Sequence, residues 1–207
     1  MINKFNLTSL FRLFLLLFGS LVMGLGVSLS ISTGYGSDSL SWAWQGISLH
    51  TNLTLNQSNM IITLLMLIPP LIYDRTQLGI GSILQPYIVG ATAEYILNQG
   101  LSNPGNFLFL IMGILLLGIG AGIYTSANLG KMPYDACVFW ISKVTKRSIG
   151  LIRSLGDLCL FIIALLLNQH LIIGPLISVF LIGYILNTTY NLINKFILKK
   201  VVSKAQF

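Results

Sequence analysis

Few residues in this chain are charged, so each charged residue inside an apolar stretch is a candidate for chemistry. Arg153 and Asp157 both lie in the apolar segment 149–167, four residues apart. Residues at this spacing share one face of a helix, so the two side chains can form an ion pair. A charge on a transmembrane helix, within the hydrocarbon of the bilayer, costs at least ~2.5 kcal/mol unless it pairs or faces water. We therefore expect Asp157 to face a bundle interior and line a solute or proton path. The alternative is that Arg153 reaches toward the membrane surface with Asp157 as its counter-ion.

A second candidate group surrounds the short segment 133–144. Pro133 suits the first position of a helix, and Asp135 follows two residues later, where the positive end of the helix favours an acid. The unpaired N–H groups at such a helix start can hold an anionic group, with Lys131 close by. The alternative is that Asp135 only caps its own helix, as Ser39 or Ser41 would cap the similar segment 40–50.

A third group lies in the segment 80–97. Glu94 shares a helical face with Gly90, and the matching face near the C-terminus carries Asn187. Gln85 stands beside Pro86, a residue that frees backbone carbonyls to line a cavity or that simply kinks the helix. We expect these polar side chains to line an interface between helices; plain placement at the membrane surface is the alternative for Glu94.

Other kinds of site find no support in the sequence. The cysteines and histidines are scattered along the chain, so we predict no metal site. No nucleophile, phosphate-binding or paired-carboxylate motif occurs, and we therefore expect neither an enzyme nor a cofactor. No basic patch interleaved with aromatic residues is present, which argues against nucleic-acid binding.

The composition indicates what surrounds these residues. Apolar residues make up 55% of the 207 positions and charged residues only 8%, against roughly 25% charged in average soluble domains. With a mean hydropathy of +0.83, the chain is predicted to be an integral membrane protein. We expect one membrane domain in the cell membrane.

Segments long enough to cross a bilayer predict six transmembrane helices in an all-α fold. They cover residues 11–31, 59–73 (extending back to 53), 80–97, 106–127, 149–167 and 171–193. The segments 40–50 and 133–144 are too short to cross and are predicted to be re-entrant or interfacial half-helices. Tyr35, Trp42 and Trp44, and likewise Tyr134 and Trp140, are expected in aromatic belts at the membrane surfaces.

The cations predict the orientation of the chain. With six spans and a cytoplasmic N-terminus, all 12 Lys and Arg residues fall on or beside the cytoplasmic side. Both termini are then cytoplasmic, and the lysine tail (Lys195, Lys199, Lys200 and Lys204) rests on anionic lipid headgroups.

The glycines indicate an internal repeat. Sliding the chain by 94 residues places four glycines of the first half on four of the second: Gly19, Gly24, Gly26 and Gly36 on Gly113, Gly118, Gly120 and Gly130. We predict two repeats, 1–105 and 106–207, each with three spans and one half-helix. An odd number of spans inverts the second copy, as in many transporters. Helix packing through small residues is the simpler explanation for any single glycine.

The loop 127–135 carries a family resemblance. Gly130, Pro133, Tyr134 and Asp135, together with Arg12, the glycine-rich end of the first helix and the stretches 79–81 and 148–150, resemble the YczE/YyaS/YitT-like bacterial membrane proteins, closest to the YczE branch. The first repeat lacks the proline and the aligned aspartate. The resemblance implies an integral membrane protein of the cell envelope and carries no established activity.

We expect the protein to bind and move a small solute, with an anionic or a proton-coupled solute both open. Two alternatives remain: a substrate-capture subunit of a larger transporter, and a non-transporting accessory or scaffold protein of envelope or secretion machinery.

Overall fold

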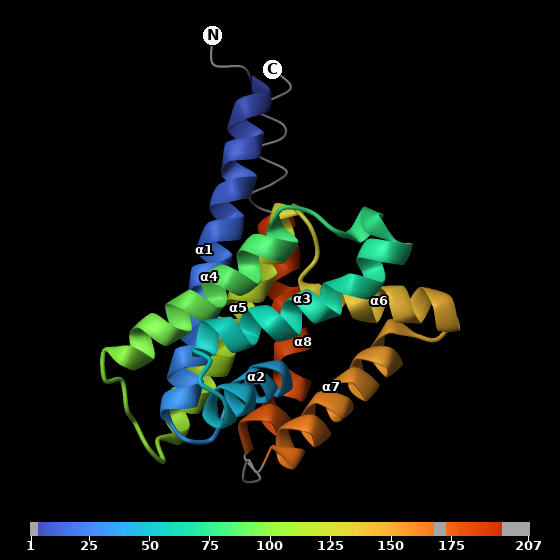
Figure 1. Ribbon diagram of the computed structural model, residues 1–207. Coiled ribbons are helices and arrows are strands. Elements are labelled where there is room, and N and C mark those ends of the chain that lie inside the picture. The colour runs from blue at the N-terminus through green and yellow to red at the C-terminus, as the bar shows by residue number, and fades with distance from the viewer. Residues whose placement is uncertain (1–3, 168–172, 196–207) are drawn as a thin grey trace.

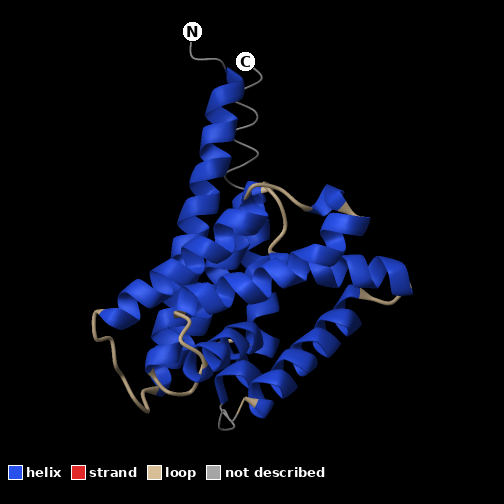
Figure 2. Ribbon diagram, in the orientation of Figure 1, coloured by secondary structure: helices blue, strands red, loops and turns tan. Residues whose placement is uncertain are grey.

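The computed structural model describes residues 4–167 and 173–195, and all regular structure in these two ranges is helical (Figures 1 and 2). Each predicted helical segment is present, with ends within a few residues of those expected apart from an earlier start of the first helix. The elements are α1 (Lys4–Ser32), α2 (Ser39–His50), α3 (Leu55–Tyr73), a short 3₁₀ turn η1 (Arg75–Gln77), α4 (Gly81–Asn98), α5 (Phe107–Ala127), α6 (Pro133–Thr145), α7 (Ile149–Leu166) and α8 (Ile173–Ile193).

Five of these helices are long and apolar enough to cross a membrane, namely α1, α3, α5, α7 and α8. The predicted sixth span is a helix, α4, but it does not reach the same apolarity because Gln85 and Glu94 interrupt it. Of the predicted lysine tail, Lys199, Lys200 and Lys204 lie outside the described residues.

Helix positions recur between the two halves of the chain. The short helices α2 and α6 begin at Ser39 and Pro133, and the long helices that follow begin at Leu55 and Ile149. Both pairs of starting residues are 94 positions apart, the same offset that aligns the glycines. Helix α1 corresponds in order to α5, and α4 to α8.

The packing between helices follows the same correspondence. Helix α1 packs against α4 as α5 packs against α8, while α2 of the first half contacts α7 and α6 of the second half contacts α3. In Figure 1 the short helices α2 and α6 accordingly lie beside long helices from the opposite half. Each half therefore places its short helix against the other half.

Glycines bring α1 and α5 into close contact at the centre of this arrangement. A Cβ on Gly26 would lie 2.5 Å from the carbonyl oxygen of Gly113, and one on Gly19 would lie 2.8 Å from that of Gly120. The earlier glycine of each helix meets the later one of its partner, so the two helices run antiparallel. Small residues at such crossings let helix backbones approach in a membrane, where apolar side chains alone give little association.

Two backbone hydrogen bonds also link the halves in matching places. Gly174 N–H donates to Tyr35 O at 2.8 Å, and Gly81 N–H donates to Leu129 O at 2.9 Å. The residues after the two acceptors, Gly36 and Gly130, have φ angles of 73° and 119°. Such angles favour glycine, so the shared glycines hold two equivalent turns, each against the start of a helix in the other half.

The far ends of the short helices are anchored as well. Lys143 near the end of α6 forms an ion pair of 2.8 Å with Asp74, which directly follows α3. In the first half, His50 at the end of α2 donates from Nε2 to the carbonyl of Leu167 after α7. Each short helix is thus fixed to the end of a long helix from the opposite half.

The prediction of aromatic belts is wrong for two of the tryptophans. Trp42 and Trp44 are 0% and 2% exposed, and Trp42 packs against Phe161 of α7 with ring centroids 5.1 Å apart. One face of α2 is buried against other helices, so these two tryptophans form core contacts. Its N-cap is Asp38, not the predicted Ser39 or Ser41.

Candidate functional site

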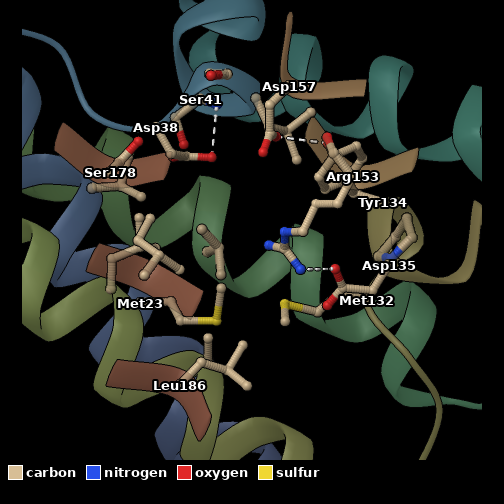
Figure 3. A pocket seen from close by; sticks show the side chains of 18 of the residues that line it. Met23, Asp38, Ser41, Met132, Tyr134, Asp135, Arg153, Asp157, Ser178 and Leu186 are labelled. Carbon is tan, nitrogen blue, oxygen red and sulfur yellow. Dashed lines mark hydrogen bonds and ion pairs between the residues drawn. The ribbon is translucent and has the colours of Figure 1, made fainter. Parts of the chain in front are cut away.

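A cavity of about 260 Å³ lies between the two halves of the chain (Figure 3). The first residues of both α2 and α6 line it, together with residues of every long helix. Its apolar wall includes Met23, Val27, Val89, Leu117, Ile182 and Leu186. Its ionisable side chains are Asp38, Tyr134, Asp135, Arg153 and Asp157. We call this space the central cavity.

Arg153 forms its ion pair with Asp135, and the predicted pairing with Asp157 is therefore wrong. Guanidinium Nη1 lies 2.7 Å from Asp135 Oδ1. The pair joins α7 to the first turn of α6, which begins at Pro133 as predicted. The Asp135 side chain does not cap α6; its carboxylate turns to the cation of the neighbouring helix. Helical spacing allowed the other pairing, but tertiary packing brought a different acid closer.

Asp157 accepts its hydrogen bond from an aromatic residue. The Tyr134 hydroxyl lies 2.7 Å from Asp157 Oδ1 and 3.0 Å from the backbone carbonyl of Arg153. The same tyrosine places its ring 5.5 Å from the Arg153 guanidinium, a distance suited to a cation–π contact. Tyr134, predicted for an aromatic belt, is a member of the site.

Asp38 belongs to the central cavity and was missed as a site residue. Its Oδ2 accepts from the Ser41 N–H at 3.4 Å, which caps α2. Its Oδ1 is buried without a hydrogen-bond partner among the described residues. Figure 3 shows the Asp38 and Asp157 carboxylates at the same end of the cavity, turned toward one another. A usable signal existed, since an aspartate before a predicted helix is a preferred N-cap.

Polar residues of α3 and α4 complete the lining. Asn59 and Thr63 stand 94 positions before Arg153 and Asp157 and line the same cavity. Asn59 Nδ2 donates to Pro86 O at 2.6 Å, so this proline carbonyl is bound by protein. The predicted site residue Gln85 also lines the cavity, with Nε2 3.7 Å from the sulfur of Met23.

Three predicted site residues do not line the central cavity. Glu94 Oε2 accepts from the Asn56 N–H at 2.9 Å, within the first turn of α3. Asn187 is exposed on α8. Lys131 holds its ammonium 3.4 Å from the ring centroid of Phe139, and burial lowers the pKa of Lys131.

A second cavity of about 720 Å³ adjoins the first. Residues of η1, Lys131 and the α5–α6 loop line it. Met132, Asp135 and Arg153 line both spaces. The Arg153–Asp135 ion pair therefore lies between the two cavities.

Comparisons with known proteins give relatives along most of the chain. An uncharacterized protein of Haemophilus influenzae is 27% identical over 185 residues, covering 86% of this chain and 83% of that protein. The uncharacterized membrane protein YczE of Bacillus subtilis is 27% identical over 173 residues, covering 81% and 80%. The uncharacterized protein YyaS of the same organism is 27% identical over 193 residues, covering 88% and 94%.

These relatives confirm the resemblance to YczE-like proteins, and the name of one of them agrees with the apolar helices in describing a membrane protein. No solved structure matches the chain significantly. A sequence profile matches residues 10–191. The chain therefore belongs to DUF6198, a family of unknown function.

Proposed function

We propose that this protein binds a small solute in the central cavity and moves it across the membrane. One observation carries the proposal: the first residues of both short helices and the charged residues of α7 line one cavity among apolar helices. Charged side chains are costly inside a membrane domain, and those that occur there commonly mark solute or ion pathways. The cavity lies between two similar halves, where transporters built from repeats place their binding sites.

The halves are proposed to be inverted repeats with six spans, α4 being the sixth. Matching helix starts, the exchanged packing of α2 and α6, and the antiparallel glycine contact of α1 with α5 support this arrangement. Helix α4 has the position of α8, which is long and apolar enough to span. Its polar residues are accounted for within the protein, since Glu94 bonds to α3 and Gln85 faces the central cavity.

The proposed orientation keeps both termini in the cytoplasm. Lys131, Lys143, Lys146 and Arg147 then lie on that side, in keeping with the positive-inside rule. Anionic headgroups of the same leaflet would attract the basic C-terminal tail.

Ligand-induced stabilisation tests the proposed binding. The purified protein in lipid nanodiscs is heated with small amines, carboxylates, amino acids, sugars and inorganic salts, each titrated separately. We expect at least one compound to raise the unfolding temperature, because a ligand that binds only the folded state stabilises it by mass action. At least one of Asp157→Asn and Arg153→Gln should weaken the effect, because the first removes a negative charge from the cavity and the second removes its positive charge. Asn187→Ala, on the exposed face of α8, is the matched control and should retain it. If no compound stabilises the protein, or all three variants respond like wild type, the proposal is wrong.

A further inference from the structure

The two halves differ at one pair of long helices. Helix α3 lies along α4, whereas α7 contacts the corresponding helix α8 at few described residues. A Cβ on Gly90 of α4 would lie 2.5 Å from Asn56 Oδ1 of α3. At the corresponding positions in the second half, Gly150 and Gly183, a Cβ would meet nothing within 4 Å. The helix pair is thus closed in the first half and open in the second.

The gap between α7 and α8 leads into the central cavity. Gly150 and Gly183 both line that cavity, one from each side of the gap. Both helices carry exposed apolar side chains, among them Leu155, Leu158 and Phe180, which are exposed by 51%, 53% and 81%. Both helices are long and apolar enough to span a membrane, and in the proposed arrangement these side chains would contact lipid acyl chains. The gap therefore connects the cavity with the hydrocarbon of the bilayer.

The charges in the cavity are not balanced by the protein. Three carboxylates and one guanidinium line it, a formal charge of −2 when all are ionised. Arg153 and Asp135 neutralise each other at 2.7 Å, which leaves Asp38 and Asp157 facing one another. A buried acceptor without a partner is unfavourable, and Asp38 Oδ1 is such an atom among the described residues. A positively charged hydrogen-bond donor would neutralise the excess negative charge and give Asp38 Oδ1 a hydrogen-bond partner.

The surroundings favour an organic cation over a metal ion or an anion. No three of the described His, Cys, Asp and Glu side chains are grouped closely enough to hold a metal ion. The wall opposite the carboxylates is apolar, with Met23 and Leu186 at the far end of the cavity (Figure 3). An anion would find the start of α2 already capped by Asp38 and the Lys131 ammonium turned to Phe139.

We infer that the central cavity takes an amphiphilic organic cation that enters from the bilayer between α7 and α8. Its ammonium group lies between Asp38 and Asp157, and its apolar part lies along the wall around Met23 and Leu186. This inference rests on the proposed function, for which it names the class of solute.

The test uses n-hexylammonium, hexanoate and hexan-1-ol as probes of equal chain length with three different head groups. The full chain in nanodiscs is titrated with each probe, and the unfolding temperature is recorded. Asp157→Asn keeps an acceptor for Tyr134, and Asp38→Asn keeps a residue that caps α2 well, so both remove charge with little change in shape. Gly183→Trp fills the gap, where a side chain meets open space, and Gly150→Trp fills it from the other helix. Tyr184→Trp, at an exposed position next to Gly183, is the control for a tryptophan on the surface of α8.

We expect n-hexylammonium to raise the unfolding temperature of wild type and of Tyr184→Trp, and hexanoate and hexan-1-ol to leave it unchanged. Each Asp→Asn change should weaken the apparent affinity about tenfold, the effect of losing one charge-assisted contact. The tryptophan variants should unfold near the wild-type temperature without probe and lose the response. Should one tryptophan variant fail to fold, the other still tests the entry route, and the two asparagine variants still test the binding site.

Two contrary results are distinguishable. Stabilisation by hexanoate that depends on Arg153 would overturn the inferred cation while leaving a solute site in the cavity. A response to n-hexylammonium that survives Asp157→Asn and Gly183→Trp would place its binding elsewhere and overturn the inference. The proposed function falls on separate results, namely a wider panel with no stabilising compound or variants that all respond like wild type.

Discussion

The guanidinium of Arg153 lies 2.7 Å from Asp135 at the start of α6, although Asp157 stands only one turn further along its own helix. The pair joins a short helix to a long one at the place where the central cavity meets its neighbour. Both side chains are partly exposed, by 36% and 23%. The ion pair therefore links two helices and lies at the boundary between the two cavities. Asp157 is not part of it and accepts its hydrogen bond from Tyr134.

Breaking this ion pair should destabilise the protein more than removing both partners. Arg153→Gln leaves Asp38, Asp135 and Asp157 in one cavity without a cation, whereas Arg153→Gln combined with Asp135→Asn removes one charge of each sign. We expect a coupling free energy of about 1–3 kcal/mol, below that of a fully buried pair because solvent reaches both groups. Unfolding of the two single variants and the double variant in mixed micelles measures it as a double-mutant cycle. Additive effects would show that the pair contributes nothing.

The contact between α1 and α5 should tolerate no added atoms. A Cβ on Gly113 would lie 2.2 Å from Ser30 Oγ and 2.6 Å from the carbonyl oxygen of Gly26, so Gly113→Ala must push the helices apart. We expect a loss of about 1–3 kcal/mol in the free energy of unfolding. Gly183→Ala is the control, since its Cβ meets open space, and it should leave stability unchanged or raise it slightly through the higher helix propensity of alanine. Equal stability of the two variants would contradict the packing described.

Glu94 should behave as a helix-end acceptor and not as part of the solute path. Its carboxylate accepts from the Asn56 N–H at 2.9 Å, a bond that Gln retains and Ala loses. We expect Glu94→Ala to cost about 0.5–2 kcal/mol, as the loss of a capping acceptor does, and Glu94→Gln to remain near wild type. Neither should alter the response to n-hexylammonium. A lost response in Glu94→Gln would return this residue to the pathway.

Cysteine labelling should reveal the proposed orientation. In a background where Cys137 and Cys159 are replaced by serine, Ser102→Cys in the α4–α5 loop should react with a membrane-impermeant maleimide in intact cells. Arg147→Cys in the α6–α7 loop should react only after permeabilisation. Both positions are exposed, so access across the membrane decides the result. Labelling of both from the same side would contradict six spans with cytoplasmic termini.

Hydropathy and segment length predicted the helices well, because an apolar run of sufficient length has few alternatives in a bilayer. Hydropathy and segment length do not predict which face of an apolar helix packs against the rest of the protein. The surface position expected for Trp42 was wrong because α7 covers it, a contact between residues far apart in the sequence. Of the predicted site residues, Asp157, Arg153, Asp135, Pro133 and Gln85 share the central cavity, while Glu94, Asn187 and Lys131 lie outside it.

The difference between these two groups has a physical reason. Arg153 and Asp135 are charged groups beside apolar spans, so both the cost of lipid exposure and their attraction bring them together within the protein. Glu94 accepts a hydrogen bond from a nearby backbone N–H of α3, and the Lys131 ammonium lies over the ring of Phe139. Such local partners depend on the packing of neighbouring helices, which periodicity does not reveal. Asp38 was missed because it lies in the loop before α2, and only the packing shows that it lines the cavity with one carboxylate oxygen lacking a partner among the described residues.

Charge movement into proteoliposomes tests the central claim most directly. Vesicles with wild-type protein on a solid-supported membrane receive a rapid pulse of n-hexylammonium, and the transient current is compared with that of protein-free vesicles. We predict a saturable inward current above the protein-free background for wild type and Tyr184→Trp, a current that needs about tenfold more n-hexylammonium for Asp157→Asn, and none above the background for Gly183→Trp. A wild-type current equal to the protein-free background, in protein that n-hexylammonium stabilises, would show binding without movement and contradict the account.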